Sequence, residues 1–264
     1  MPHLRINDIH LYYEQHGSGP DLLLIGGLSS DHQVWKSTVR FLSSHFRILI
    51  FDNRGAGQTD TPDYPYSIDM MAEDVLALMD SLAIKKAHIL GHSMGGAIAQ
   101  QIALSAPEKI NKLVLVSTRD KISAIGDLLF ATREKLQAIG VSADLLAEYV
   151  MPFLFSETFL KNTVNVKGFA QWTLQNAHPQ SAIGFKNQFH ASRSRDFTAQ
   201  LHRISAPNLV IVGMEDILVP MHYAENFSKS LKNSHFIAIP DCAHMPHVEK
   251  SALFVETVRA FLEK

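Results

Sequence analysis

The stretch Gly91-His92-Ser93-Met94-Gly95-Gly96 decides the fold of this chain. A short apolar run at 87–90 precedes it, and a run rich in helix formers at 97–104 follows it. This order predicts a buried strand, a tight turn and a helix. The turn has the pattern G-x-S-x-G, in which the serine hydroxyl is pushed into the open and the glycines let neighbouring elements pack closely. Three fixed letters alone are a weak signal, so the interpretation depends on the flanking segments and on partner residues downstream.

Composition narrows the class of protein. The chain has 264 residues, 24 basic and 26 acidic side chains, and 46% hydrophobic residues, which is typical of a globular protein with a large core. The balanced charge gives no footprint for nucleic acid or an anionic membrane surface, and no run approaches the ~20 apolar residues of a membrane span. One cysteine, Cys242, excludes an internal disulfide. With no apolar signal core at the N-terminus, we expect a cytoplasmic protein.

The rest of the chain alternates between strand and helix patterns. A hairpin is predicted around Asn7-Asp8, and Ser67 is a candidate N-cap for a helix with apolar residues at helical spacing over 68–82. A last helix is predicted over 251–262. The alternation predicts an α/β fold with a mainly parallel sheet. Its expected strands after the hairpin are Asp21–Ile25, Arg47–Asp52, Ala87–Leu90, Lys112–Ser117, Asn208–Gly213 and His235–Ile239.

One long segment interrupts this alternation. Over residues 119–203 the strand signal fades, and helix-like pieces such as 125–138 and 145–150 replace it, in a segment with many aromatic residues. About 85 residues far exceed an ordinary crossover between parallel strands. We therefore expect a helical cap over 119–203, inserted into a core formed by 1–118 and 204–264. The alternative is a set of crossover helices whose aromatic residues are simply core.

A serine hydroxyl is a poor nucleophile unless a base lies within hydrogen-bond reach and a third group orients that base. In a G-x-S-x-G protein the acid and the histidine should follow Ser93 in that order, after late strands. Asp216, after the strand at 208–213, is the predicted acid, with Glu215 as its competitor. His244 lies between the last strand and the last helix and is the predicted base, with His247 as the runner-up.

An acyl transfer also requires preformed donors for the oxyanion. The backbone N–H of Met94, at the start of the helix, is one expected donor. The N–H of Leu28 is the other, because the glycines at 26 and 27 allow close backbone approach to a ligand. Asp52 and Arg54 follow another strand and are expected to pin a loop rather than to react. No metal-ligand spacing, phosphate-binding loop or dinucleotide fingerprint is present, so we expect no metal and no cofactor.

At this point the chain resembles the α/β-hydrolase superfamily. The matching pieces are Gly26-Gly27-Leu28, Asp52-Asn53-Arg54-Gly55, Gly91-His92-Ser93-Met94-Gly95-Gly96, Gly213-Met214-Glu215-Asp216 and Ala243-His244. The resemblance implies an eight-stranded, mostly parallel sheet with one antiparallel strand, helices on both faces and a helical cap. Many members carry His-Gly where this chain has Gly26-Gly27, a departure that removes a side chain from the pocket rim.

Within the superfamily the chain is similar to small cytoplasmic carboxylesterases and to 3-oxoadipate enol-lactonases. The likeness to the latter rests on Ser29-Ser30-Asp31 with Trp35, on Asn53-Arg54-Gly55 and on the serine motif. A serine at 93 argues against haloalkane dehalogenases and epoxide hydrolases, which use an aspartate there.

These observations predict a serine hydrolase that cleaves small carboxylic esters through an acyl-Ser93 intermediate. The expected partner is a small-molecule ester or lactone, without nucleic acid or membrane; the oligomeric state is left open. Alternatives are a lactonase, a C–C bond hydrolase and, from another class, a ligand-sensing protein with slow turnover. An anionic lactone would require a cation in the cap, for which Lys186, Arg193 and Arg195 are candidates.

Overall fold

The structure, a computed structural model, describes residues 3–264 and contains one eight-stranded sheet in the order β1-β2-β4-β3-β5-β6-β7-β8. β2 runs antiparallel to both of its neighbours, and every other adjacent pair is parallel. This is the sheet that the resemblance implies. The strands are β1 (His3–Ile6), β2 (Ile9–His16), β3 (Asp21–Ile25), β4 (Arg47–Phe51), β5 (Ala87–His92), β6 (Ile110–Val116), β7 (Asn208–Gly213) and β8 (Ser234–Ile239).

Strands β3, β5, β6 and β7 form the middle of the sheet. Their apolar runs are continuous because helices cover both faces, so alternate side chains on each strand are equally buried. Gly91 of β5 pairs with Ile25 on one side and with Leu115 on the other. The end of β5, where the chain turns at Ser93, therefore lies at the centre of the sheet edge.

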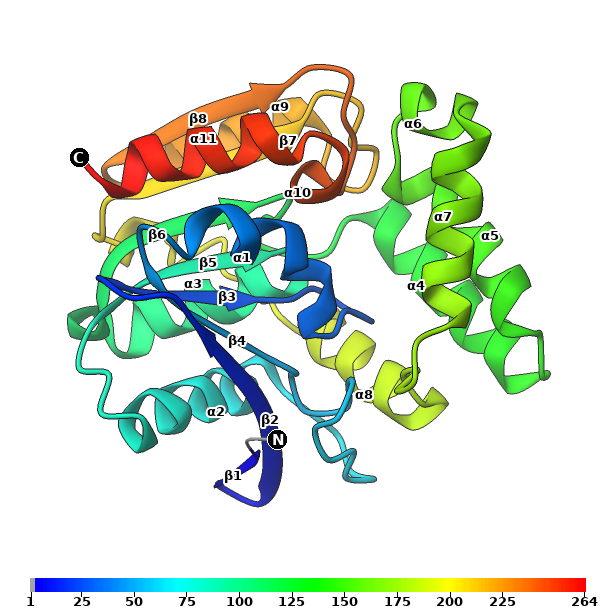
Figure 1. The fold of residues 1–264 in the computed structure, drawn as a ribbon, viewed down its shortest axis with the longest axis horizontal. Coiled ribbons are helices and arrows are strands. Elements are labelled where there is room, and N and C mark those ends of the chain that lie inside the picture. Colours follow the sequence, from blue (N-terminus) through cyan, green and yellow to red (C-terminus); the bar gives the residue numbers. More distant parts are fainter. Residues whose placement is uncertain (1–2) are drawn as a thin grey trace.

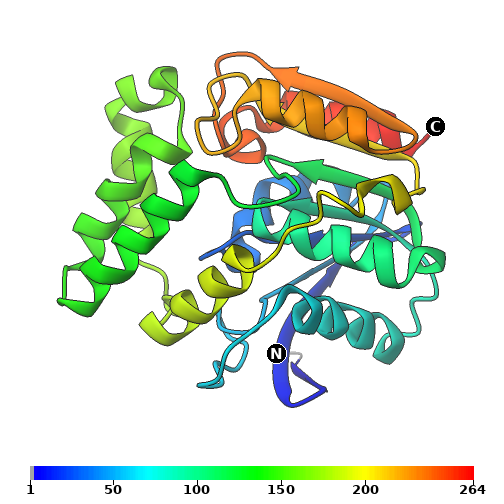
Figure 2. The same cartoon turned by 180° about the vertical axis from the view of Figure 1, so that it is seen from behind.

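Two layers of helices flank the sheet (Figures 1 and 2). Helices α1 (Lys36–Leu42) and α11 (Ser251–Leu262) cover one face, and Figure 1 shows them in front of it. Figure 2 shows α2 (Ile68–Ser81), α3 (Met94–Ser105) and α9 (Met221–Ser230) over the opposite face. The hydroxyl of Ser67 accepts a hydrogen bond from the Met70 N–H and caps α2, as the sequence predicts.

Five helices lie between β6 and β7 and form the insert. They are α4 (Ala124–Ala138), α5 (Ala143–Leu154), α6 (Glu157–Lys161), α7 (Thr163–Leu174) and α8 (Ala182–Arg193). The short turn η3 (Leu201–Arg203) follows them before β7, and the short helical turns elsewhere are η1 (His32–Trp35), η2 (Pro107–Lys109) and α10 (Pro246–Glu249). Because β6 leads directly into the insert, these helices lie at the carboxyl edge of the parallel strands, on the right of Figure 1.

The aromatic residues of the insert pack mainly against one another and against the core. Phe155 stacks on Phe159 at 4.1 Å between ring centroids and contacts the edge of Phe169. Phe155 also belongs to the apolar cluster that contains Trp35 and Phe254, on the face of the sheet that α1 and α11 cover. The insert is thus joined to the core by continuous apolar packing, which holds it over the sheet edge.

Candidate functional site

Ser93 occupies a strained position between β5 and α3. Its backbone has φ 53° and ψ −116°, outside the regions that a non-glycine residue ordinarily adopts. Several hydrogen bonds hold it there: its N–H donates to the Val116 carbonyl at 2.9 Å, and its own carbonyl accepts from the Thr118 hydroxyl at 2.8 Å. The turn is fixed by β6 and the loop after it, so the serine side chain is presented at a defined position.

The glycines of the motif leave space for backbone, not for ligand. A Cβ at Gly91 would clash with the carbonyl of Gly95, and a Cβ at Gly95 would clash with the carbonyl of Ile25 at the end of β3. A Cβ at Gly96 would clash with the side chain of Thr118. Helix α3 can therefore start close to the sheet only with glycine at these positions, which is the role that the sequence pattern predicts.

The structure brings Ser93, His244 and Asp216 together from three distant parts of the chain. His244 Nε2 lies 3.0 Å from Ser93 Oγ, and His244 Nδ1 lies 2.9 Å from Asp216 Oδ2. A carboxylate only accepts hydrogen bonds, so Nδ1 carries the hydrogen and Nε2 is free to accept from the serine hydroxyl. The carboxylate and imidazole are almost completely buried, with side-chain exposures of 0% and 4%. A serine hydroxyl in this arrangement can be activated as a nucleophile.

Asp216 is itself held in place by backbone donors. Its Oδ1 accepts from the N–H groups of Leu218 and Val219 at 2.9 and 2.8 Å, in the loop between β7 and α9. These bonds leave Oδ2 for the histidine. Glu215, the competing acid, is exposed and accepts a hydrogen bond from the Glu157 N–H of the insert. The longer side chain at 215 therefore faces away from Ser93, whereas that of Asp216 faces the imidazole.

The loop that carries His244 is fixed at both of its backbone polar groups. The His244 N–H donates to the Leu154 carbonyl at the end of α5 at 3.1 Å, and the His244 carbonyl accepts from the His92 ring at 2.8 Å. Burial keeps the pKa of His92 well below the ordinary value, so this ring is neutral. The sequence analysis assigns His92 no role; its place directly before Ser93 is the signal that could have drawn attention to it.

His247, the other candidate base, does not reach Ser93. Its ring is fully buried, 4.7 Å from that of Trp35 and 4.6 Å from that of His92, and neither of its nitrogens has a hydrogen-bond partner among the described residues. Burial lowers its pKa to about 3. The residue is an uncharged aromatic packing element behind the site.

The loop after β3 passes directly beside the serine. A Cβ added at Gly27 would lie 3.2 Å from Ser93 Cβ, so the absence of a side chain is what allows this approach. The N–H groups of Leu28 and Met94 donate no hydrogen bond to any residue within 3–264. Leu28, Met94 and Ser93 all line one small cavity. Two free N–H groups beside a serine hydroxyl suit the binding of a developing oxyanion.

Two cavities meet at Ser93 and His244, under the insert. The smaller, of about 80 Å³, lies toward the loop after β6, and its other walls include Phe130 and Leu218. The larger, of about 210 Å³, extends beneath α4, α5 and α7, and its walls include Arg133, Leu146 and Trp172. A small substrate bound at Ser93 therefore has a mostly apolar space on each side.

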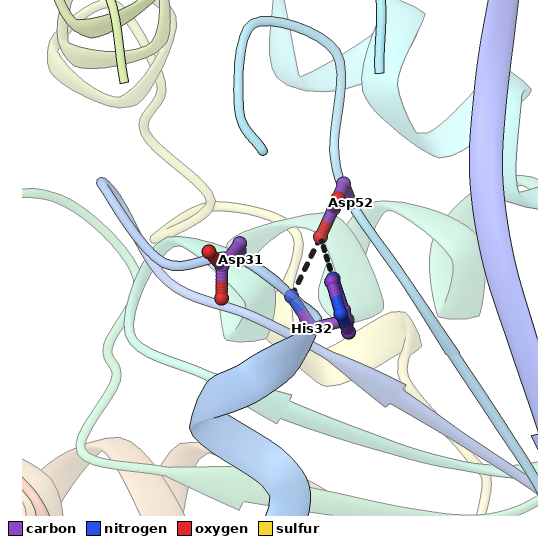
Figure 3. A group of neighbouring side chains, drawn as sticks. All are labelled: Asp31, His32 and Asp52. Atoms are coloured by element: carbon purple, nitrogen blue, oxygen red, sulfur yellow. Dashed lines mark hydrogen bonds and ion pairs between the residues drawn. The ribbon is translucent and has the colours of Figure 1, made fainter. Parts of the chain in front are cut away.

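A second group of polar side chains, Asp31, His32 and Asp52, lies at the ends of neighbouring strands (Figure 3). Asp52 Oδ1 accepts from the backbone N–H and the Nδ1 of His32, and its Oδ2 accepts from the Gln58 N–H. Asp31 caps η1 through the Gln33 N–H and points away from that pair in the figure. The carboxylate oxygens are thus used to pin loops, and the group carries no argument for a metal.

The surroundings of Arg54 and Cys242 indicate structural and not chemical roles. The Arg54 guanidinium donates to both carboxylate oxygens of Asp74, at 2.6 and 2.8 Å, and both groups are buried. Arg54 thus pins its loop, as the sequence analysis expects, although its partner is Asp74 and not Asp52. Cys242 is fully buried, and burial raises the pKa of its thiol far above the ordinary value, which makes it inert. Across residues 3–264, no helix has the length and apolar character needed to cross a membrane.

Comparison with known proteins places the site in context. RutD of Agrobacterium fabrum, named provisionally as a carbamate hydrolase, is 30% identical over 260 residues, which cover 96% of this chain and 98% of RutD. The 3-oxoadipate enol-lactonase 2 of Acinetobacter baylyi is 26% identical over 263 residues, 99% of this chain and 96% of that enzyme.

Solved structures share the whole fold. The enol-lactonase from Burkholderia xenovorans LB400 superposes with a TM-score of 0.90 and 26% identity, covering 100% of both chains. A thermophilic esterase from Thermogutta terrifontis, with malate bound, gives a TM-score of 0.87 at 26% identity, covering 100% of this chain and 98% of the esterase. Residues 20–251 match the family described as the alpha/beta hydrolase fold, to which this chain therefore belongs.

Proposed function

We propose that this protein is a serine hydrolase that cleaves small carboxylic esters through an acyl-Ser93 intermediate. The observation that carries the proposal is the position of His244, with one ring nitrogen 3.0 Å from Ser93 Oγ and the other 2.9 Å from Asp216 Oδ2. Ser93, His244 and Asp216 are the proposed catalytic residues, and the N–H groups of Leu28 and Met94 form the proposed oxyanion hole.

In the first half of the reaction, Ser93 Oγ attacks the ester carbonyl carbon while His244 Nε2 takes the hydroxyl proton. The carbonyl oxygen becomes an oxyanion that accepts hydrogen bonds from Leu28 and Met94. The carbon–oxygen bond to the alcohol then breaks, and the proton on His244 passes to the departing alkoxide. Asp216 holds the imidazole in the required tautomer and stabilises its charged form.

The second half releases the acid. His244 takes a proton from a water molecule, whose oxygen attacks the acyl carbon of acyl-Ser93. Collapse of the second tetrahedral intermediate breaks the bond to Ser93 Oγ, and His244 returns the proton to that oxygen. The scheme requires no cofactor and no metal.

We propose that residues 119–203 form a cap on a core made of residues 1–118 and 204–264. The position of this cap over Ser93 supports the proposed reaction. Its helices roof both cavities at Ser93, and the Leu154 carbonyl of α5 accepts from the His244 N–H. A roof of this kind limits substrate size and excludes water from the reacting carbonyl. The apolar walls would favour short hydrocarbon chains on the acyl or alcohol side.

A lactonase is the second candidate, because a lactone is a cyclic ester and the same residues would open it. Two of the relatives reported above carry the name enol-lactonase, one of them at a TM-score of 0.90. A ligand sensor would retain the same fold with slow turnover, so the rate of hydrolysis distinguishes it from either enzyme.

Hydrolysis of p-nitrophenyl esters from acetate to laurate tests the proposal. We expect rapid turnover of short chains by the wild type and a loss of about 10⁴-fold or more in kcat for Ser93→Ala. Ser105→Ala, on the exposed end of α3, is the matched control and should keep full activity. Turnover by Ser93→Ala at the wild-type rate would overturn the scheme, and slow turnover of the whole series by the wild type would favour a sensor.

A further inference from the structure

Arg133 places a positive charge in the wall of the larger cavity at Ser93. It projects from α4 and shares that cavity with Ser93 and His244. Its guanidinium lies over the ring of Phe185, 4.1 Å from the centroid, and its Nη1 donates to Ser29 Oγ at 2.6 Å. Ser29 directly follows Leu28, a proposed oxyanion donor. The guanidinium is therefore hydrogen-bonded to the residue next to that donor.

The charge on Arg133 is not compensated by the protein. Among residues 3–264, no carboxylate lies within ion-pair distance of it, and its buried Nε has no hydrogen-bond acceptor. Burial lowers the pKa of the guanidinium to about 10. A desolvated cation without a counter-charge is costly, so a site that retains one is suited to an anionic ligand.

The acidic residue in the wall of the same cavity already has hydrogen-bond partners. Asp31 also lines the cavity, but its carboxylate accepts from the Gln33 N–H and from the Asn176 side chain. Gln137, one helical turn after Arg133, lines the cavity too, and its buried Oε1 has no partner among the described residues. The polar end of this cavity thus holds one guanidinium N–H, of Arg133, and one amide oxygen, of Gln137, that no described residue satisfies.

The cations expected from the sequence have different surroundings. Arg193 pairs with Asp127 at 2.8 Å and lines neither cavity. Arg195 lines the smaller cavity, as a cation near the site should, but it lies 3.6 Å from Asp69. Lys186 is exposed and does not line either cavity. Arg133 is therefore the arginine of the insert that faces the larger cavity without an acidic partner.

We propose that Arg133 binds a carboxylate of the substrate, so that the preferred substrates are small esters or lactones of acids that carry a second, free carboxylate. The guanidinium would donate charge-assisted hydrogen bonds to that carboxylate, and Leu146 and Trp172 would contact the hydrocarbon between it and the scissile carbonyl. This inference rests on the proposed ester hydrolysis at Ser93 and names its substrate class.

The test compares monomethyl esters of succinate, glutarate and adipate with the methyl esters of the matching primary amides, which have the same shape without the charge. For the best chain length, the wild type should prefer the carboxylate by at least about tenfold in kcat/KM. Arg133→Gln should lower the ratio of kcat/KM for the carboxylate to kcat/KM for the amide to about one, mainly through KM for the carboxylate. Arg133→Lys should restore part of the preference. Lys135→Gln, an exposed cation on the same helix, should keep all of it.

Two outcomes would overturn the inference. One is a wild type with equal kcat/KM for both substrate classes, and the other is an Arg133→Gln variant that slows both classes equally, which is the result of a purely structural role. A test without variants uses inhibition of neutral-ester hydrolysis: glutarate should inhibit the wild type at least about tenfold better than glutaramide, and equal inhibition would contradict the proposal.

Failure of the proposed hydrolysis is distinguishable from failure of this inference. If the wild type cleaves no ester, calorimetric binding of glutarate still measures the anion site. Binding that weakens at least about tenfold in Arg133→Gln supports the carboxylate site, and equal binding by both proteins overturns it.

Discussion

The Nε2 of His92 donates a hydrogen bond of 2.8 Å to the backbone carbonyl of His244. His92 directly precedes Ser93, so the strand that presents the serine also fixes the loop that presents the base. The His92 ring has no charge because burial keeps its pKa low, and the bond is a neutral one between two buried groups. The spacing between Ser93 and His244 thus depends on a side chain that reaches neither the serine hydroxyl nor the proposed oxyanion hole.

We expect His92→Phe to lower kcat by about 10- to 100-fold with little change in KM, because a small displacement of the base slows proton transfer more than substrate binding. The unpaired His244 carbonyl should also reduce the free energy of unfolding by about 1–3 kcal/mol. Ester kinetics and urea unfolding measure the two effects. His88→Phe, the same change on the same strand away from the site, is the control; an equal fall in kcat there would contradict the positioning role.

Gly95→Ala should destabilise the protein by roughly 3 kcal/mol, since its Cβ would meet the backbone carbonyls of Ile25 and Gly26, which cannot rotate away. Gly168→Ala provides the contrast. Gly168 lies within α7, and a Cβ there meets nothing within 4 Å, so alanine should stabilise by about 0.5–1 kcal/mol. Thermal unfolding of both variants checks this; equal effects at the two positions would show that the close approach of α3 to β3 is not a constraint.

Buried neutral histidines should make the protein less stable in acid. The pKa of His247 is about 3 in the folded state, against an ordinary 6.5, so between these values the unfolded chain binds the proton and the folded protein does not. Its stabilising contribution is present above pH 6.5 and is lost as the pH falls toward 3. From pH 7.5 to pH 5 the loss is about 2 kcal/mol for this residue.

His247→Phe keeps an aromatic ring at this position and removes the titration. Urea unfolding at pH 7.5 and pH 5 should therefore show a pH dependence that is smaller by about 2 kcal/mol in the variant than in the wild type. The remaining dependence should include His88, whose pKa burial lowers to about 4. An unchanged pH dependence in the variant would mean that His247 is not the buried neutral group described here.

The Cys242 thiol should be unreactive in the native protein and should take no part in catalysis. Its thiol is fully buried with a raised pKa, so a thiol reagent such as dithionitrobenzoate should react with it only after unfolding. Cys242→Ala should retain the wild-type kcat. Rapid labelling of the native protein, or a loss of activity on labelling, would contradict this prediction and make Cys242 a candidate nucleophile.

The α/β class could be predicted from the sequence because each strand and helix of the core has its own local pattern of apolar residues. Apolar runs predicted the central strands within a few residues, and β7 and α11 match their predicted ranges. The resemblance implied eight strands, mostly parallel with one antiparallel, and the structure shows such a sheet; the strand order comes from the structure alone. The helices of the insert were predicted only in part, over α4 and a piece of α5, because their apolar residues are divided between the core, one another and two cavities and leave no simple period.

The sequence by itself determined the tight turn at Ser93 and the chain order of Ser93, Asp216 and His244. It did so because the glycine spacing and the positions where the strands end can both be read along the chain. Only the tertiary structure decided between His244 and His247, which are three residues apart. His247 is buried against Trp35, whereas His244 is hydrogen-bonded to both Ser93 and Asp216. Arg133 shows the same limit. An arginine is recognised as unpaired only when every carboxylate around it has been placed, and those carboxylates come from distant parts of the chain.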